Sequence, residues 1–313
     1  MTVATAPRLA WEHRAYPARP FVRHRADTDA PLRVARVGRR DGGPLVSFLV
    51  PTLDGDRDGR LARLLDDVHA QTWTDWELVA VLGDRRQGRA INAAAALAGG
   101  CLLVTLDDDT ALVEPRAVER LVEAVEADAT IGLAGGVNVV PPGAPWLAAR
   151  AMREIPRRAT PPVAGVTDSD LAEHPLLLAR RDVFEAVGGE NELIPRGLDP
   201  YLREAVRTAG HRVVVVPGAR YGHLPPATAR GLLRQFFRNG RAAAFVARRH
   251  PEWLIETPAR HGPFRARRPW PLRALRVPAR MALAAATGRP VWLACQMAYV
   301  AGWLCERVAP GDH

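Results

Sequence analysis

Four short apolar runs, separated by helix-like segments, limit the folds open to this chain. They are LVSFLVPT (45–52), WELVAVL (76–82), CLLVTL (101–106) and RVVVVP (212–217). Each run is too short for a helix and lacks alternating polar positions, so we interpret it as a strand buried on both faces. Two further segments between the third and fourth runs, IGLAGGVNVV and HPLLLAR, also indicate strands.

The segments between these strands carry apolar residues at helical spacing. DGDRDGRLARLLDDVHAQ, GRAINAAAALAGG and EPRAVERLVEAVEAD are the clearest examples. Strands that alternate with helices predict an α/β fold, Rossmann-like, with a mostly parallel sheet and flanking helices. Ligands of such sheets bind at the carboxyl ends of the strands.

The charge is unevenly distributed along the chain. Residues 1–44 carry nine arginines against four acidic residues, and 228–313 carry fifteen against four, whereas 45–227 carry 19 against 26. We therefore expect an N-terminal arm (1–44), a folded catalytic domain (45–227) and a basic helical C-terminal region (228–313). A nucleic-acid partner is not expected, because the basic charge lies away from the folded middle; a membrane surface fits the basic ends better.

The C-terminal region is predicted to be helical. TARGLLRQFFRNGRAAAFVARRHPEW (228–253) combines an apolar face with an arginine face. The most apolar segment, 291–305, is shorter than the roughly 20 residues needed to span a bilayer, so we interpret it as interfacial or as a packed helix, with a tilted or re-entrant segment as the alternative. The N-terminus lacks the apolar stretch of a secretory signal. We expect a cytoplasmic protein, with peripheral contact to the inner face of the cell membrane left open.

Two absences restrict the chemistry. The chain contains no lysine, which excludes a Schiff-base lysine and a Walker-type phosphate loop. Its three cysteines, Cys101, Cys295 and Cys305, lack the spacing of a zinc site and fit a reducing compartment.

Three consecutive aspartates, Asp107, Asp108 and Asp109, directly follow the third strand. Carboxylates packed together at a strand end repel one another and lose hydration, so a positive partner is expected there. The alternative is an aspartate-rich start to the helix near Glu114.

Four blocks, in order, resemble family-2 glycosyltransferases of the GT-A fold. They are VSFLVPTLDG, QTWTDWELVAV, GRAINAAAALAGGCLLVTLDDD and LLLARRDVFEAVGGENELIPRGLDPYLREAVRTAGHRVVVVP, and they extend from about residue 45 to about residue 250. The resemblance implies transfer of a sugar, with inversion, from a nucleoside-diphosphate sugar to an acceptor hydroxyl. The acceptor would serve a cell-envelope polysaccharide, a glycolipid or a related glycoconjugate, and a lipid-linked acceptor is one option.

The resemblance also assigns the aspartates to a DxD motif. Asp107 and Asp109 would bind Mn²⁺ or Mg²⁺, Asp107 and Asp108 would contact the nucleotide-sugar, and His223 would complete the metal ligands. Oxygen ligands suit both cations, and an imidazole favours Mn²⁺. The other histidines, such as His69, His174 and His211, have no comparable context and are interpreted as structural.

The same resemblance places the catalytic base at Asp199. A single carboxylate there would remove the proton of the acceptor hydroxyl. The family's preceding acid is replaced by Leu198. Alternatively, Asp199 with Pro200 is only a helix start signal.

Nucleotide contacts are expected at six further positions. The resemblance implies Pro51, Thr52 and Asp54 after the first strand, Asp84 after the second, and Arg89 and Asn92 at the start of the next helix. The sequence after the second strand departs from the family pattern, and Glu190 replaces an aromatic residue in the turn GGENE (188–192). The loop 157–174 is expected to cover the acceptor.

Two other functions remain open. One is a sugar-phosphate nucleotidyltransferase, against which the missing glycine- and lysine-containing loop argues. The other is a non-catalytic, membrane-associated protein that binds nucleotide-sugars.

Overall fold

The computed structural model describes residues 9–28, 30–42, 45–262 and 269–311. Their strands join in one sheet with the order β1-β2-β4-β3-β5-β9-β7-β10-β6, and β8 pairs with β10. The strands are β1 (Glu12–Arg14), β2 (Leu32–Arg39), β3 (Val46–Thr52), β4 (Trp76–Leu82), β5 (Leu102–Thr105), β6 (Ala111–Leu112), β7 (Ile131–Asn138), β8 (Thr167–Asp168), β9 (Leu177–Arg180) and β10 (Arg212–Gly222).

The centre of the sheet is largely parallel, as expected. β3 runs parallel to β4 and β5, and β10 runs parallel to β7. β9 lies between β5 and β7 and is antiparallel to both. The four apolar runs of the sequence are β3, β4, β5 and β10, and their interiors are buried.

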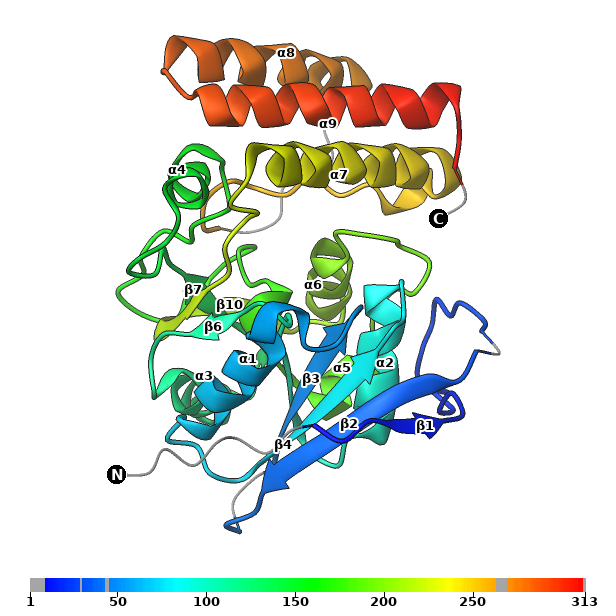
Figure 1. The fold of residues 1–313 in the computed structure, drawn as a ribbon, viewed down its shortest axis with the longest axis vertical. Helices are drawn as coiled ribbons and strands as arrows, with labels where there is room; N and C mark the ends of the chain where they lie inside the picture. The colour runs from blue at the N-terminus through cyan, green and yellow to red at the C-terminus, as the bar shows by residue number, and fades with distance from the viewer. Residues whose placement is uncertain (1–8, 29, 43–44, 263–268, 312–313) are drawn as a thin grey trace.

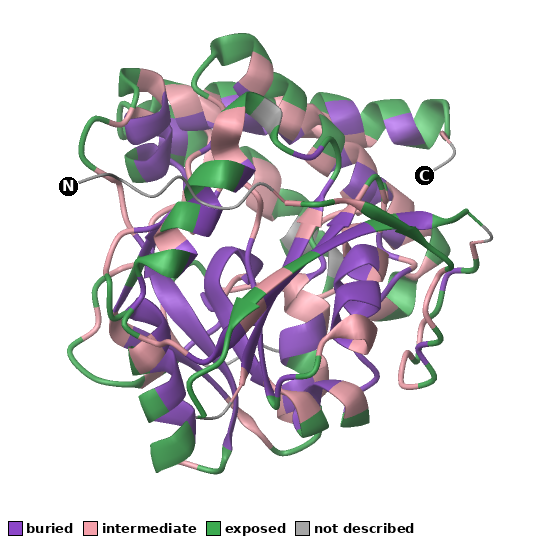
Figure 2. Cartoon of the chain, turned by 60° about the horizontal axis from the view of Figure 1, so that its bottom comes forward, coloured by how far each residue is buried: buried purple, intermediate pink, exposed green. Residues whose placement is uncertain are grey.

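Helices cover both faces of the sheet. α1 (Arg60–His69) and α3 (Ala117–Ala127) bury their apolar stripes against one face. α2 (Gln87–Leu97), α5 (Arg181–Ala186) and α6 (Asp199–Thr208) pack on the other. Figure 2 shows this layering, with buried strands at the centre and helices whose outer sides are exposed. The predicted α/β fold with flanking helices is confirmed.

Part of the segment expected as an N-terminal arm belongs to the sheet. β2 pairs antiparallel with β4, from Arg33 opposite Leu82 to Arg39 opposite Trp76. Between β1 and β2 the chain crosses to the 188–192 turn, where the backbone N–H of Arg23 donates to the carbonyl of Gly188 at 3.0 Å. We call residues 15–28 the strap. Residues 1–8 and 43–44 of the expected arm lie outside the described residues.

Three long helices follow the sheet. α7 (Ala229–Arg249), α9 (Pro290–Val308) and α8 (Trp270–Ala286) stack outward in that order, as Figure 1 shows, beside the short α4 (Trp146–Glu154). α7 and α9 cross at two glycines: a Cβ on Gly240 would lie 2.0 Å from the carbonyl oxygen of Tyr299, and one on Gly302 would lie 2.0 Å from that of Phe237. The apolar segment 291–305 is therefore a packed helix.

Glu154 fixes the beginning of α9. Its Oε2 accepts from the backbone N–H groups of Val291 at 2.8 Å and Trp292 at 3.1 Å. A carboxylate at a helix N-terminus is stabilising, because it satisfies free N–H donors and complements the helix dipole. None of the helices in the described ranges is long and apolar enough to cross a membrane.

Candidate active site

The sequence places three ionisable side chains at one edge of the sheet. Asp107 and Asp109 follow β5, and His223 follows β10. His223 Nε2 lies 3.2 Å from Asp109 Oδ1 and 3.7 Å from Asp107 Oδ2. One ligand atom from each residue can be chosen so that all three atoms lie within 4.8 Å of one another. The structure thus brings the three predicted metal ligands together.

The electrostatics of this cluster favour a cation. Burial and the neighbouring Asp109 carboxylate raise the pKa of Asp107 to about 6, against the lowering effect of His223. Burial alone would lower the pKa of His223, but its hydrogen bond to Asp109 and the charge of Asp107 raise that pKa overall. Two carboxylates and an imidazole form a donor set that Mn²⁺ or Mg²⁺ accepts. These residues could therefore hold a divalent metal.

Neighbouring side chains orient the aspartates. Gln87 Nε2 donates to Asp107 Oδ1 at 2.8 Å, and Arg60 Nη1 lies 3.2 Å from Asp109 Oδ2. Thr52, at the end of β3, donates its hydroxyl proton to Asp108 Oδ2 at 2.7 Å. Asp108 thus positions the loop after β3, since the Thr52 hydroxyl also accepts from the N–H of Gly55 at 3.2 Å.

The aspartates line a cavity of about 990 Å³. Pro51, Thr52 and Asp84, which are predicted to contact the nucleotide, also line it. Asp54 is exposed and is not among the lining residues. Basic residues gather on the walls, which include Arg60, Arg63, Arg85, Arg196, Arg234 and Arg238. A volume of this size fits a nucleoside-diphosphate conjugate.

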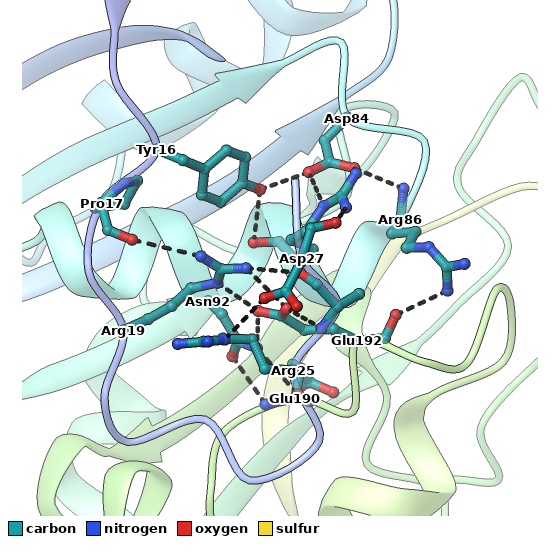
Figure 3. A network of polar contacts seen from close by, with 12 residues as sticks. Tyr16, Pro17, Arg19, Arg25, Asp27, Asp84, Arg86, Asn92, Glu190 and Glu192 are labelled. Atoms are coloured by element: carbon teal, nitrogen blue, oxygen red, sulfur yellow. Dashed lines mark hydrogen bonds and ion pairs between the residues drawn. The ribbon is translucent and has the colours of Figure 1, made fainter. Parts of the chain in front are cut away.

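Asp84 is already engaged by other side chains (Figure 3). Its Oδ2 accepts from the Tyr16 hydroxyl at 2.5 Å and from Arg89 Nε at 2.8 Å, and its Oδ1 accepts from Arg89 Nη2 at 2.9 Å. These donors hold the pKa of Asp84 below its usual value against the effect of burial. Tyr16, in the strap, was not foreseen because residues 1–44 show no periodicity.

Arg89 and Asn92, expected beside the nucleotide, point elsewhere. Arg89 is turned to Asp84 and to the carbonyl of Asp27, at 3.1 Å. Asn92 is fully buried, and its amide group bonds to the backbone of Glu190 and to the carboxylate of Glu192. Neither lines the cavity. Their positions at the start of α2 follow from the sequence, but tertiary partners set their direction.

Asp199 lines a second cavity of about 610 Å³. Asp107, His223 and Arg196 line both cavities, so the second lies directly beside the Asp107–Asp109–His223 cluster. Residues of the 157–174 loop, including Arg158, form part of its wall. Leu198 is fully buried and packs in the core on the α6 side of the sheet.

His174, interpreted from the sequence as a surface or core residue, is buried and contacts Asp199. Its Nδ1 lies 3.0 Å from Asp199 Oδ1, and its backbone N–H donates to the same oxygen at 2.8 Å. Its Nε2 lies 2.7 Å from Glu190 Oε1. The sequence carried one signal for this pairing, an acid at position 190 where the family pattern has an aromatic residue.

Neither a protein-family model nor a curated protein matches the sequence. Among solved structures, the chain is similar to the mannosyltransferase PcManGT from Pyrobaculum calidifontis in complex with GDP-Man and Mn²⁺, with 15% identity over 88% of this chain and 90% of that chain and a TM-score of 0.57. TarS 1-349 from S. aureus in complex with UDP-GlcNAc is 11% identical over 65% of this chain and 66% of that chain, with a TM-score of 0.45. The likeness to PcManGT shows a shared fold. The chain has the GT-A-like fold expected from its sequence.

Proposed function

We propose that the chain is a metal-dependent, inverting glycosyltransferase that moves a sugar from a nucleoside-diphosphate sugar to an acceptor hydroxyl. One observation carries the proposal. The Asp107–Asp109–His223 cluster stands between a cavity large enough for the donor and a second cavity that contains the carboxylate of Asp199. A donor and an acceptor bound in the two cavities would meet beside the cluster.

Each residue then has a defined task. Asp107, Asp109 and His223 hold a divalent cation, which when bound neutralises the charge that develops on the leaving diphosphate. Asp199 accepts the proton of the acceptor hydroxyl as that oxygen attacks the anomeric carbon. With the diphosphate on one side of that carbon and Asp199 on the other, a single displacement inverts the anomeric centre.

The walls of the second cavity support an amphiphilic, anionic acceptor. Arg158 and Arg196 bond to neutral side chains, to Gln235 at 3.0 Å and Asn239 at 3.1 Å. Burial lowers the pKa of both guanidinium groups, which an acceptor anion would offset. Apolar side chains from α7, α9 and the segment after α7 also line this cavity: Val246, Leu254, Ile255 and Trp303.

We therefore propose a lipid-linked acceptor of cell-envelope glycoconjugate synthesis. A cytoplasmic protein that rests peripherally on the inner face of the membrane would reach such an acceptor. The exposed leucines of α8 and the basic charge of residues 228–313 support this position.

A thermal-stability screen tests the donor site. The wild type would be heated with GDP, UDP or dTDP and then with GDP-mannose or UDP-N-acetylglucosamine, each with and without Mn²⁺. Ligand at a hundred times its dissociation constant adds about 2.7 kcal/mol to the free energy of unfolding. We expect a manganese-dependent rise in Tm with one nucleotide, lost in Asp109→Ala and kept in Glu126→Gln, an exposed carboxylate change on α3.

The other outcomes separate the rival functions. Wild-type protein that gains no stability from any nucleotide contradicts the proposed donor site. Manganese-dependent binding without release of nucleoside diphosphate from any donor favours a non-catalytic binding protein. Formation of a nucleotide-sugar from a sugar phosphate and a nucleoside triphosphate would identify a nucleotidyltransferase.

A further inference from the structure

A chain of buried polar contacts extends from Asp199 into the protein. His174 lies between two carboxylates, 3.0 Å from Asp199 and 2.7 Å from Glu190. The side chains of His174 and Glu190 are 2% and 0% exposed, whereas that of Asp199 is 25% exposed. Asp199 and His174 both line the second cavity, Asp199 is the more exposed of the two, and Glu190 stands behind them.

Glu190 is itself held in place. Asn92 accepts from the backbone N–H of Glu190 at 2.8 Å and donates to its carbonyl at 2.9 Å. Asn92 also donates to Glu192, whose carboxylate forms a buried ion pair with Arg19 of the strap at 2.6 Å. Figure 3 shows this arrangement around the strap. Because Asn92 bonds to both backbone groups of Glu190, the Glu190 carboxylate is held in a fixed position beside His174.

The contacts constrain the protons of His174. A neutral imidazole has one N–H, but here both ring nitrogens face carboxylate oxygens, so only a doubly protonated ring can donate to both ionised partners. Burial alone would lower the pKa of His174, and the charges of Asp199 and Glu190 raise it well above its usual value. A buried cation between two carboxylates is the paired arrangement that offsets the cost of burying charge.

The surrounding charges act on the imidazolium in opposite directions. Asp107 at the end of β5 adds negative charge on the side of the metal cluster, and Arg203 of α6 adds positive charge beside Asp199. Glu190 Oε2 is buried and has no hydrogen-bond partner in the described part of the chain. The imidazolium is therefore the main compensation for the Glu190 charge.

We propose that His174 and Glu190 are positioning residues for Asp199, with His174 holding Oδ1 so that Oδ2 is directed at the acceptor hydroxyl. This inference rests on the proposed function. In the reaction, the acceptor oxygen bonds to the anomeric carbon, and the bond from that carbon to the diphosphate oxygen breaks with its electron pair. The acceptor proton ends on Asp199 Oδ2, and His174 keeps its own protons.

Two substitutions at His174 separate its two contacts. The amide nitrogen of asparagine can occupy the position of Nδ1 and that of glutamine the position of Nε2. His174→Asn can therefore keep the bond to Asp199, whereas His174→Gln keeps only the bond to Glu190. Exposed His13 on β1 provides the matched control, His13→Gln.

The assay is release of nucleoside diphosphate from the donor sugar identified in the stability screen, with Mn²⁺ present and water as the acceptor. We expect kcat to fall about 100-fold in His174→Gln, as for a reacting group displaced by about 1 Å, and less in His174→Asn. The KM for the donor and the manganese-dependent rise in Tm should stay unchanged in both. His13→Gln should behave as wild type.

Each result decides a different question. A wild type that releases nucleoside diphosphate beside folded His174 variants of unchanged kcat would overturn the positioning role and leave the proposed function intact. Equal losses in donor binding and kcat would also overturn it, because they indicate general damage. A wild type that releases none from any donor sugar would overturn the proposed function, and the positioning role with it.

A second measurement needs only stable wild-type protein. With ¹⁵N-labelled histidine, both ring nitrogens of His174 should carry protons at pH 7, and their signals should move in Asp199→Asn. A ring with one bare nitrogen would contradict the imidazolium bridge. This result holds even where the His174 variants do not fold.

Discussion

At the scale of single residues, the pKa of Asp107 shows how the cluster lowers the free energy of unfolding. Its pKa is about 6 in the folded protein, against an ordinary value of 3.8 for a solvated aspartate in an unfolded chain. The folded state therefore binds the Asp107 proton more tightly than the unfolded state does. As the pH rises from about 4 to about 6, ionisation of Asp107 lowers the free energy of unfolding. At neutral pH the whole of this penalty is present.

Asp107→Asn should accordingly stabilise protein kept in a chelator while removing its response to Mn²⁺. A shift of about two pKa units corresponds to at most about 3 kcal/mol at pH 7.5. Urea unfolding at several pH values measures it, and the gain should disappear below about pH 4, where both states hold the proton. A gain that is the same at every pH would show that repulsion in the cluster is not the cause.

The candidate metal ligands were predictable from the sequence because the resemblance assigned them and because strand ends in an α/β sheet meet at one edge. Asp107 and Asp109 lie within three residues of the predicted strand 101–106, whereas His223 lies six residues beyond the predicted strand 212–217 and was assigned through the resemblance. The contacts of Tyr16 and His174 were not predictable. They join residues far apart in the chain, and neither helical nor strand periodicity carries information about such pairings.

At the scale of elements, periodicity identified the buried strands and the helices but not all of their partners. β9 is antiparallel to its neighbours, and an apolar run alone does not reveal direction. β2 was missed because its buried positions, such as Leu32, Val34 and Ala35, do not alternate strictly. Its arginines suggested an exposed arm, although long side chains can lie along the outer face of an edge strand.

The crossing of α7 and α9 gives a test at this scale. Gly240→Ala places a methyl group against the backbone of α9 and should lower the free energy of unfolding by about 1–3 kcal/mol, despite the better helix propensity of alanine. Gly165→Ala is the control, because nothing lies within 4 Å of its added Cβ. Equal urea midpoints for both variants would show that α7 and α9 accommodate the added methyl group without loss of stability.

At the scale of the whole molecule, charge and exposed apolar surface coincide on the C-terminal helices. α8 exposes Leu272, Leu275 and Leu283, and α9 exposes Met297 and Leu304. The basic excess of residues 228–313 surrounds them in sequence. The sequence predicted this region as helical and basic, but which apolar residues remain exposed depends on how α8 and α9 pack.

Vesicle sedimentation tests the proposed membrane contact. The protein should bind phosphatidylcholine vesicles that contain phosphatidylglycerol, bind pure phosphatidylcholine weakly, and dissociate as salt rises. Leu275→Asp should weaken binding about tenfold, because one leucine no longer enters the lipid interface. Val166→Asp, a change at an exposed apolar residue before β8, should have little effect. Binding that ignores lipid charge would contradict an electrostatic contact.

The helices α7 and α9, which contribute to the lining of the second cavity, also affect which nucleophile can reach the donor. In the proposed reaction, Asp199 could deprotonate water as well as a sugar hydroxyl. A cavity open to solvent would therefore lead to hydrolysis of the donor. α9 is anchored at one end by Glu154, and at the other by Glu306, which pairs with Arg241 and Arg248 of α7. In the proposed reaction, loosening these anchors would shift the partition from transfer towards hydrolysis, so the fidelity of the reaction would depend on helix packing.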